Sequence, residues 1–475
     1  MEKLEKDTKV NDPNPAKDDS PDLTAIKSNP LGTEAPCDVF NSDQGDVNFR
    51  GVSWQAAAIL IAKFQIGLGA LSIPSTFHVL GFFPGIVCFL VMAMISTVAG
   101  YICGNARQYY PYVHSIGDAA EILFGKGARE LVGFIYYIYL AMTAGAGMLT
   151  TSVALNTLSE HATCTMVLVA ATCVAGIIIS LWITAIACLT QDRPAAGPST
   201  GPVDLDIRLF PKTTFPQAMT AISNQLFAVG ASGTFCSIAA EMKHPEKFTR
   251  ALIYGQSFIV LTCIAIGSIV YGNIGQYLAS PALGSAGPLI AKISYGIALP
   301  GLVVTAVLYS HIAAKYWFVR LLRGTRHLQS NTVKHWTVWV GSMIVTVVFA
   351  FIIVGVVPFF GDFLSLVGAL VNPVFTNIIP GFMLLFFIAR KPMKAIEGVQ
   401  PLRPEESAME RHWLVDAFKA YRKGWKNVVA LCVACFLLLS GMFIIIGGTY
   451  STVLSIKQSY DEGEVGSVFS CADNS

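Results

Sequence analysis

Apolar stretches recur along most of this chain, and they constrain its fold more than any other feature. A helix needs about 20 apolar residues to cross a hydrocarbon core of ~30 Å. Backbone groups inside a bilayer find no water to bind, and the alternation typical of strands is absent, so each stretch is predicted to form a helix. Ten stretches are long enough: 52–80, 84–104, 131–155, 165–189, 215–240, 251–272, 289–318, 336–357, 359–388 and 428–448.

The composition supports a lipid environment and excludes several function classes. Hydrophobic residues make up 53% of the 475 residues and charged residues only 13%, about half the charge of an ordinary soluble domain. A net charge of +2 leaves no basic excess for nucleic acid. The sequence has no phosphate loop, no hydrolase or protease motif and no Cys/His spacing typical of a metal site. We therefore expect neither an enzyme nor a cofactor or metal.

Charge also divides the chain into three parts. Residues 1–50 carry six Lys or Arg and eleven Asp or Glu without an apolar run, which predicts a disordered tail. Lys and Arg are concentrated in alternate connections, and the positive-inside rule makes those connections cytoplasmic. The prediction is thus a cytoplasmic tail at 1–50, a transmembrane domain at 51–448 and an acidic extracytoplasmic tail at 449–475.

The topology contains one inconsistency. Three stretches, 131–155, 165–189 and 215–240, lie between two basic connections that both read as cytoplasmic, although a return to the same side needs an even number of crossings. One explanation is that a helix has been lost near 180–183, where two half-spans are joined. The alternative is that one of the three stretches is re-entrant.

Two stretches carry helix-breaking residues at mid-span. The first contains GLGALSIP at 67–74 and the fifth contains VGASGT at 229–234. Within a helix, Gly costs about 1 kcal/mol and Pro about 3 kcal/mol relative to Ala. Paired interruptions are typical of transporters, because unwound backbone offers N–H groups to a substrate carboxylate and C=O groups to its ammonium. The alternative is that small residues only allow close helix packing.

Lys63 is the second feature of the first stretch that needs an explanation. It lies eleven residues into the stretch, or ~16 Å at 1.5 Å per residue, close to the middle of the bilayer. A lysine there costs about 2.5 to 3.5 kcal/mol, so it is expected to face the bundle interior. Its ammonium group either occupies the position of a sodium ion or exchanges a proton, or the residue only ties helices together through hydrogen bonds to carbonyl groups.

Other polar residues allow two interpretations each. Glu241 ends the fifth stretch and is either a cytoplasmic gate or a solvated interface charge. Tyr136, Tyr137 and Tyr139 form either a pocket for a substrate side chain or an aromatic belt facing lipid.

Several segments carry a family resemblance. They are 66–74 with 77–81, SIGDAA at 115–120 continuing to Gly125, DRPAA at 192–196, and EMK at 241–243. Through them the chain resembles the amino acid/auxin permease family, and within it the fungal neutral amino-acid permeases of the methyltryptophan-resistance type. The resemblance extends from about residue 51 to 448.

The resemblance implies an all-α, polytopic bundle with the inverted repeat of the amino acid/polyamine/organocation type. It implies that the first and sixth family spans are broken, and that neutral amino acids enter with protons. We expect the plasma membrane rather than the vacuole. Lys63 falls where sodium-coupled relatives have an Asn. The implied substrate-binding residues are Gly67, Leu68, Gly69, Ala70, Gly230, Ala231, Ser232 and Gly233.

The family has eleven spans, and its fifth is the one expected to be missing here. Because that helix completes the first repeat beside the site, two alternatives to a transporter stay open. One is a non-transporting amino-acid sensor, and the other is an inactive, truncated isoform.

Overall fold

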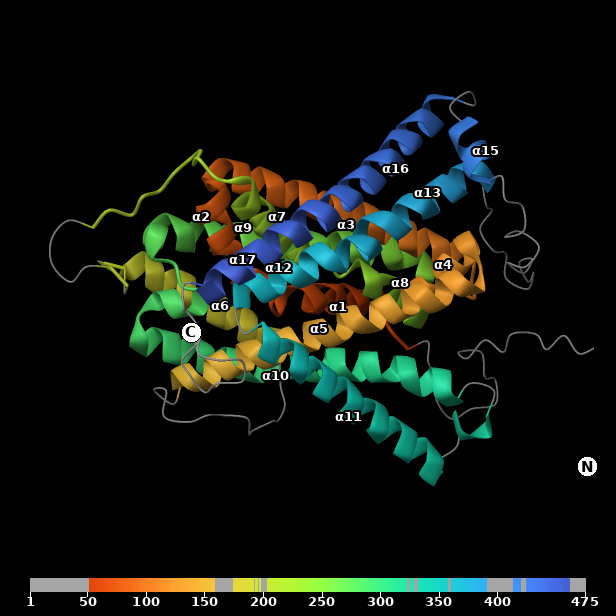
Figure 1. Cartoon of the computed structure of the whole chain (residues 1–475), viewed down its shortest axis with the longest axis horizontal. Helices are drawn as coiled ribbons and strands as arrows, with labels where there is room; N and C mark the ends of the chain where they lie inside the picture. The colour runs from red at the N-terminus through yellow and green to blue at the C-terminus, as the bar shows by residue number, and fades with distance from the viewer. Residues whose placement is uncertain are drawn as a thin grey trace, which may run out of the picture. The chain divides into compact units, whose positions relative to one another are not determined.

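The computed structural model describes residues 51–158, 174–191, 193–194, 196–197, 203–322, 325–328, 332–357, 360–390, 413–419 and 424–461. The expected tail at 1–50, the start of the stretch predicted at 165–189, and the last residues of the acidic tail lie outside them. Within the described residues, all regular structure is helical (Figure 1), and one isolated bridge joins Val52 to Met242.

Seven helical stretches among the described residues are long and apolar enough to cross a bilayer, which confirms the all-α, polytopic prediction. In two of them a π-helical turn joins two helices: η6 (Val374–Ile378) follows α12, and η8 (Ile444–Gly448) follows α16. The seven comprise α3 (Phe82–Tyr109), α5 (Lys126–Leu158), α9 (Phe248–Ile274), α10 (Pro288–Leu322), α11 (Val333–Val356), α12 (Phe360–Leu370) with α13 (Ile379–Arg390), and α16 (Trp425–Phe443) with α17 (Thr449–Asp461).

Shorter elements connect these helices. Ser115 caps α4 by accepting a hydrogen bond from the Asp118 N–H, and the Asp118 carboxylate accepts one from the Ser115 N–H, so this sequence starts a helix where the chain leaves α3. The shorter elements are α4 (Ile116–Phe124), α6 (Val174–Thr190), α15 (Trp413–Lys419), η2 (Pro245–Lys247), η3 (Gly275–Tyr277), η4 (Ala282–Ala286) and η5 (Arg326–Leu328).

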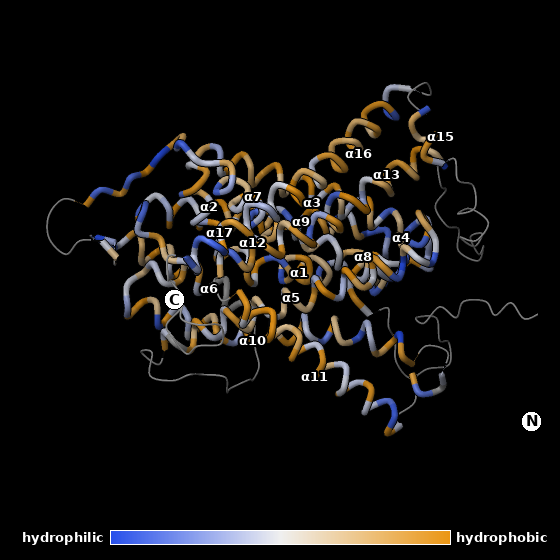
Figure 2. The backbone as a smooth tube through the Cα atoms, viewed as in Figure 1, coloured by the Kyte–Doolittle hydropathy of each residue, from blue (hydrophilic) through white to orange (hydrophobic). Residues whose placement is uncertain are grey.

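The most apolar helices are also the least covered by protein. Only 17% of the apolar 18-residue segment of α11 is buried inside the protein, and only 22% of that of α16 with α17. The corresponding share for α5 is 72%. In Figure 2, hydrophobic residues run along α13 and α16, while hydrophilic ones gather in the connections. Apolar faces of this extent are not stable in water, so lipid covers them.

Both predicted interruptions are present. The first broken helix consists of α1 (Trp54–Ile66), the short η1 (Gly69–Leu71) and α2 (Ile73–Leu80). The second consists of α7 (Phe215–Val229) and α8 (Ser232–Glu241), which are separated by two non-helical residues.

The two broken helices run side by side in opposite directions. At one end, the Val52 N–H donates to the carbonyl of Glu241 over 3.1 Å. At the other end, the Thr213 hydroxyl donates to the carbonyl of Val79 over 2.7 Å. The start of each broken helix therefore meets the end of the other, and their interruptions lie at the same level.

α5 and α6 run in the same direction. Leu158, the last residue of α5, lies beside Gly296 near the start of α10, and Gln191, just after α6, donates to the carbonyl of Ala286, just before α10. Both helices therefore end at the face where α10 begins. If α1 with α2 is counted as the first crossing, α3 is the second and α5 is the third. Because α6 runs parallel to α5, it takes the place of a fifth crossing, and a fourth crossing is not seen in the described residues.

Residues 180–183, where we expected a lost helix, lie inside the uninterrupted helix α6. Two joined half-spans would also form one continuous helix, so this expectation stays a prediction. The return from Leu158 to Val174 falls outside the described residues. The end of the chain also differs from the expectation, since the helix that crosses from Trp425 continues past Gly448 to Asp461.

Candidate functional site

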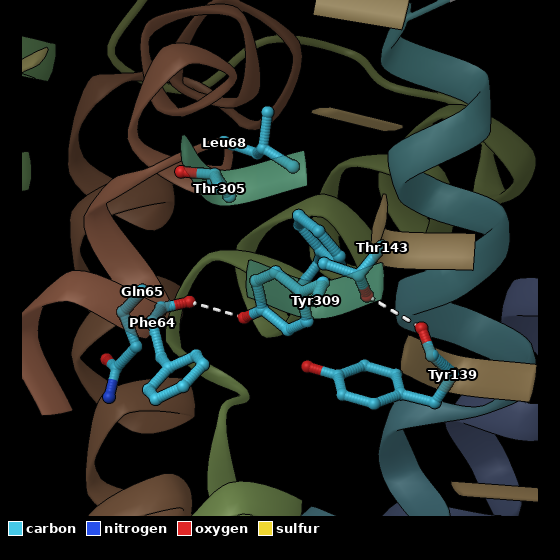
Figure 3. Close-up of a pocket in the computed structure, with 9 residues that line it drawn as sticks. Phe64, Gln65, Leu68, Tyr139, Thr143, Thr305 and Tyr309 are labelled. Carbon is cyan, nitrogen blue, oxygen red and sulfur yellow. Dashed lines mark hydrogen bonds between the residues drawn. The ribbon is translucent and has the colours of Figure 1, made fainter. Parts of the chain in front are cut away.

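A small cavity lies between α1, α5, α7 and α10, next to the first interruption (Figure 3). Its volume is about 10 Å³, which is room for about one water molecule. The structure therefore shows the cavity closed. The described residues that line it are Phe64, Gln65, Leu68, Gly69, Tyr139, Thr143, Phe227, Thr305 and Tyr309.

A tyrosine from α10 stabilises the end of α1. The carbonyl of Phe64 lies in the last turn of α1, where carbonyl groups have no helical partner. The Tyr309 hydroxyl donates to it over 2.8 Å, and the two rings meet edge to face with 5.5 Å between centroids (Figure 3). The interruption is thus held by a side chain 245 residues further along the chain.

Gln65 is the most unusual polar group of the cavity. Its side chain is only 3% exposed, and neither the nitrogen nor the oxygen of its amide has a hydrogen-bond partner among the described residues. Leaving a buried polar group unpaired costs about 1 to 3 kcal/mol. An amide that lines a cavity under this penalty is suited to bind a polar ligand.

Side chains from the surrounding helices bind the carbonyls of the second interruption. The Ser96 hydroxyl on α3 donates to the Val229 carbonyl over 2.5 Å, and the Tyr139 hydroxyl on α5 donates to the Gly230 carbonyl over 3.4 Å. Ser96 also accepts a hydrogen bond from Gln256 on α9. These carbonyls are already hydrogen-bonded, so a ligand reaches them only through their second lone pairs.

Glycine permits close packing at both interruptions. A Cβ atom on Gly69 would lie 2.2 Å from the Cα atom of Ala228, and one on Gly230 would lie 1.8 Å from Nδ2 of Asn372. Asn372 in turn donates to the carbonyl of Leu226 in the last turn of α7. The packing explanation therefore holds for both glycines, and it brings the first interruption directly against α7.

The structure brings together some of the predicted site residues and leaves others apart. Leu68 and Gly69 line the cavity, and Gly67 and Ala70 are buried beside them. The four predicted residues of the second interruption are buried but do not line the cavity, so their role in binding stays a prediction. These four are Gly230, Ala231, Ser232 and Gly233.

Sequence reasoning missed most of the cavity wall. Tyr139 belongs to the aromatic group for which we considered a pocket, and its ring does face the cavity. Gln65 is visible as an amide two residues before the first glycine. The side chains from α7 and α10 carry no local signal, because only the packing of distant helices brings them here. The missed residues are Phe64, Gln65, Thr143, Phe227, Thr305 and Tyr309.

Lys63 and Glu241 lie at helix ends rather than in the cavity wall. Lys63 is half-buried in the last turn of α1, where the helix dipole stabilises a positive charge. Glu241 is the half-buried last residue of α8. The positive charge of Lys315 on α10 acts on its carboxylate, which connects α8 with α10 electrostatically.

Comparisons with known proteins identify the family of this chain. The chain matches the family model described as transmembrane amino acid transporter protein over residues 50–192 and 196–401. A transmembrane transporter of Fusarium pseudograminearum is 29% identical over 473 residues, covering 95% of this chain and 93% of that protein. The N amino acid transport system protein of Neurospora crassa is 24% identical over 454 residues, covering 91% and 90%.

Solved structures give weaker similarities. The inward-facing conformation of Mhp1 is 15% identical, covers 89% of this chain and 93% of its own, and has a TM-score of 0.43. A manganese transporter of Eremococcus coleocola is 10% identical, covers 85% and 94%, and has a TM-score of 0.42. The family model spans most of the sequence, as the first two relatives do. The chain is therefore a multi-pass membrane protein that belongs to the transmembrane amino acid transporter family, the amino acid/auxin permease family.

Proposed function

We propose that this protein transports neutral amino acids, aliphatic and aromatic, by proton symport with alternating access. The observation that carries the proposal is the unpartnered amide of Gln65, in a closed cavity beside the break in α1. A ligand with both hydrogen-bond donors and acceptors satisfies this amide, and an amino acid has both. The name of the Neurospora crassa relative, which refers to amino acid transport, supports the same substrate class.

The cavity wall favours a neutral substrate. No Asp, Glu, Lys or Arg is among the described residues that line it. A charged substrate side chain would lie there without a counter-ion, at a high desolvation cost. The aromatic rings of Phe64, Tyr139, Phe227 and Tyr309 instead provide apolar contact area, which suits aliphatic and aromatic side chains.

The small volume of the cavity supports alternating access. Space for about one water molecule does not hold an amino acid, so binding requires the surrounding helices to separate. The broken helices are suited to this movement, because each half is joined to the other by only a few non-helical residues. We propose that one half of each broken helix moves away to open the cavity to one side at a time.

For the coupling ion we propose a proton that Lys63 binds and releases. Lys63 lies one turn before the break at Gly67, so a change of its charge alters the field at the interruption. Glu241, at the predicted cytoplasmic end of α8, is proposed as a gate residue that interacts with Lys315 when that side is closed.

Uptake by reconstituted protein tests the proposal. Proteoliposomes containing the full chain are given radiolabelled L-leucine with and without an inwardly directed proton gradient. Saturable accumulation that depends on the gradient is expected. Saturable uptake with no response to the gradient would rule out proton coupling, and uptake that does not saturate would indicate a channel.

A second candidate function is a non-transporting amino-acid sensor. It is favoured by the parallel course of α5 and α6, which agrees with the odd number of apolar stretches between two basic connections. An inactive, truncated isoform accounts for the same observation. Binding of leucine without flux identifies the sensor, whereas the inactive isoform shows neither.

Location and domain limits complete the proposal. We propose the plasma membrane rather than the vacuole, with residues 1–50 in the cytoplasm and the chain beyond Asp461 on the other side. A fluorescent fusion identifies the membrane. Proteolysis of intact cells is expected to remove an epitope placed at the C-terminus and to spare one placed at the N-terminus.

A further inference from the structure

A second and larger cavity lies apart from the central one. It is a cleft of about 730 Å³ between α2, α7 and α17, and it shares no lining residue with the central cavity. Its polar lining includes Thr76 on α2 and Thr220 and Asn224 on α7. By the predicted orientation it opens on the extracytoplasmic side, where α2 ends and α7 begins.

Two polar atoms in the wall of this cleft have no partner. Oδ1 of Asn224 and Oγ1 of Thr220 are both buried, and neither forms a hydrogen bond with another described residue. The Asn224 residue as a whole is only 6% exposed. The two residues are four positions apart on α7 and therefore share one face of that helix. The carbonyl oxygen of Asn224 can only accept a hydrogen bond, so its partner must be a donor such as an ammonium group.

The opposite wall offers one charge of each sign. Lys457 and Asp461 are four positions apart on α17, both are exposed, and both line the cleft. Their charges sum to zero, so the cleft does not favour a simple cation or a simple anion. It complements a molecule that carries both charges, whose carboxylate meets Lys457 and whose ammonium meets Asp461 or the oxygen of Asn224.

We propose that this cleft is a second, outer binding site for a zwitterionic amino acid. The inference rests on the proposed transport function and extends it. Asn224 precedes the break at Gly230 by six residues, or about 9 Å along a helix, so an amino acid held here lies on the extracytoplasmic side of the break. A zwitterionic lipid headgroup shares the charge pattern, but the buried, unpartnered oxygens of Thr220 and Asn224 lie in the α7 wall, and acyl chains cannot satisfy them.

Cysteine protection tests the outer site. Leu454 lines the cleft and is 38% exposed, so a thiol in Leu454→Cys is accessible to a membrane-impermeant methanethiosulfonate reagent. We expect saturating L-leucine to slow labelling of this variant about tenfold, as about 90% occupancy requires. Lys212→Cys is the matched control, because Lys212 is exposed but does not line the cleft, and its labelling is expected to stay unchanged.

Further variants separate the outer site from the central one. Asn224→Leu and Lys457→Ala, each combined with Leu454→Cys, are expected to raise the half-protecting leucine concentration about tenfold, as loss of one charge-assisted hydrogen bond predicts. Lys457 is exposed, so its variant keeps the test valid if Asn224→Leu fails to fold. Protection should persist in Gln65→Leu, which changes only the central cavity.

The contrary outcomes are distinct. Absence of leucine protection would overturn the outer site. Loss of protection in Gln65→Leu would overturn it as well, because the protection would then come from the central cavity. Protection by glycerophosphocholine but not by leucine would assign the cleft to a lipid headgroup and overturn the proposal as well. Leucine uptake without protection of the cysteine would overturn only the outer site. Protection without uptake would contradict the transport function and would still support the outer site.

Discussion

At the scale of single residues, the site depends on residues that are unusual in the stretch where they occur, a polar amide among apolar side chains and a glycine inside a helix. Gln65 lies within an apolar stretch, yet its amide has no partner among the described residues. Gly69 is a helix breaker in the sequence, and in the structure it is also the point where the first interruption touches α7. The sequence shows that both residues are unusual, but it does not show what they contact, since contacts across helices are set by packing.

The first prediction concerns Gly69. A Cβ atom at this position would lie 2.2 Å from the backbone of Ala228, so Gly69→Ala forces the interruption away from α7. We expect leucine uptake to fall about tenfold, as overpacking of 1 to 3 kcal/mol implies. Gly272→Ala is the control, because nothing lies within 4 Å of its Cβ position. Equal uptake by the two variants, at equal abundance, would show that this close approach does not matter.

The second prediction concerns Lys63. If Lys63 carries the coupling proton, Lys63→Ala removes the response to a proton gradient and lowers gradient-driven uptake about tenfold or more. Exchange of leucine without a gradient should be much less affected. The measurement compares uptake with surface abundance. Parallel losses of both quantities would make Lys63 a folding residue instead.

At the scale of elements, the sequence predicts where helices lie and break but not how they pair. Gly, Ser and Pro fix the interruptions to within a few residues, because their cost in a helix is local. The antiparallel pairing of the two broken helices depends on contacts such as Val52 with Glu241, which no local pattern contains. The place of the missing crossing stays a prediction, because parity shows that the predicted crossings are inconsistent in number but not where the inconsistency arises.

The third prediction concerns the hydrogen bond that ends α1. Tyr309→Phe removes the donor to the Phe64 carbonyl while keeping the ring, so the last turn of α1 loses its link to α10. A single hydrogen bond of this kind contributes about 1 kcal/mol, which corresponds to a roughly fivefold lower rate of leucine uptake. Tyr254→Phe, at an exposed site on α9, is expected to behave like the unaltered chain. A normal rate in Tyr309→Phe would mean that α1 ends without this bond.

At the scale of the whole molecule, the fold places two cavities with polar groups in their walls along α7, inside an otherwise apolar bundle. The central one is closed and the outer one is open, and their nearest lining residues on α7, Phe227 and Asn224, are less than one turn apart. Composition and hydropathy predict the membrane bundle well, because lipid selects for apolar length alone. They predict the cavities poorly, since α10 and α17 supply cavity walls from distant parts of the chain.

The fourth prediction concerns topology. If α5 and α6 both end at the face where α10 begins, Thr157→Cys and Gln191→Cys react with an impermeant thiol reagent from the same side of the membrane. Lys247→Cys, in the exposed connection after α8, should react from the opposite side. Labelling of Thr157→Cys and Gln191→Cys from opposite sides would contradict the parallel course of the two helices.

The central claim is that an amino acid binds between the broken helices, against the amide of Gln65. The most direct measurement is the KM for leucine uptake by Gln65→Leu, compared with Gln276→Leu, whose exposed amide donates to the carbonyl of Asp204 far from the cavity. The account predicts that KM rises about tenfold for Gln65→Leu and is unchanged for Gln276→Leu. An unchanged KM in both variants, with both proteins at normal abundance, would contradict it.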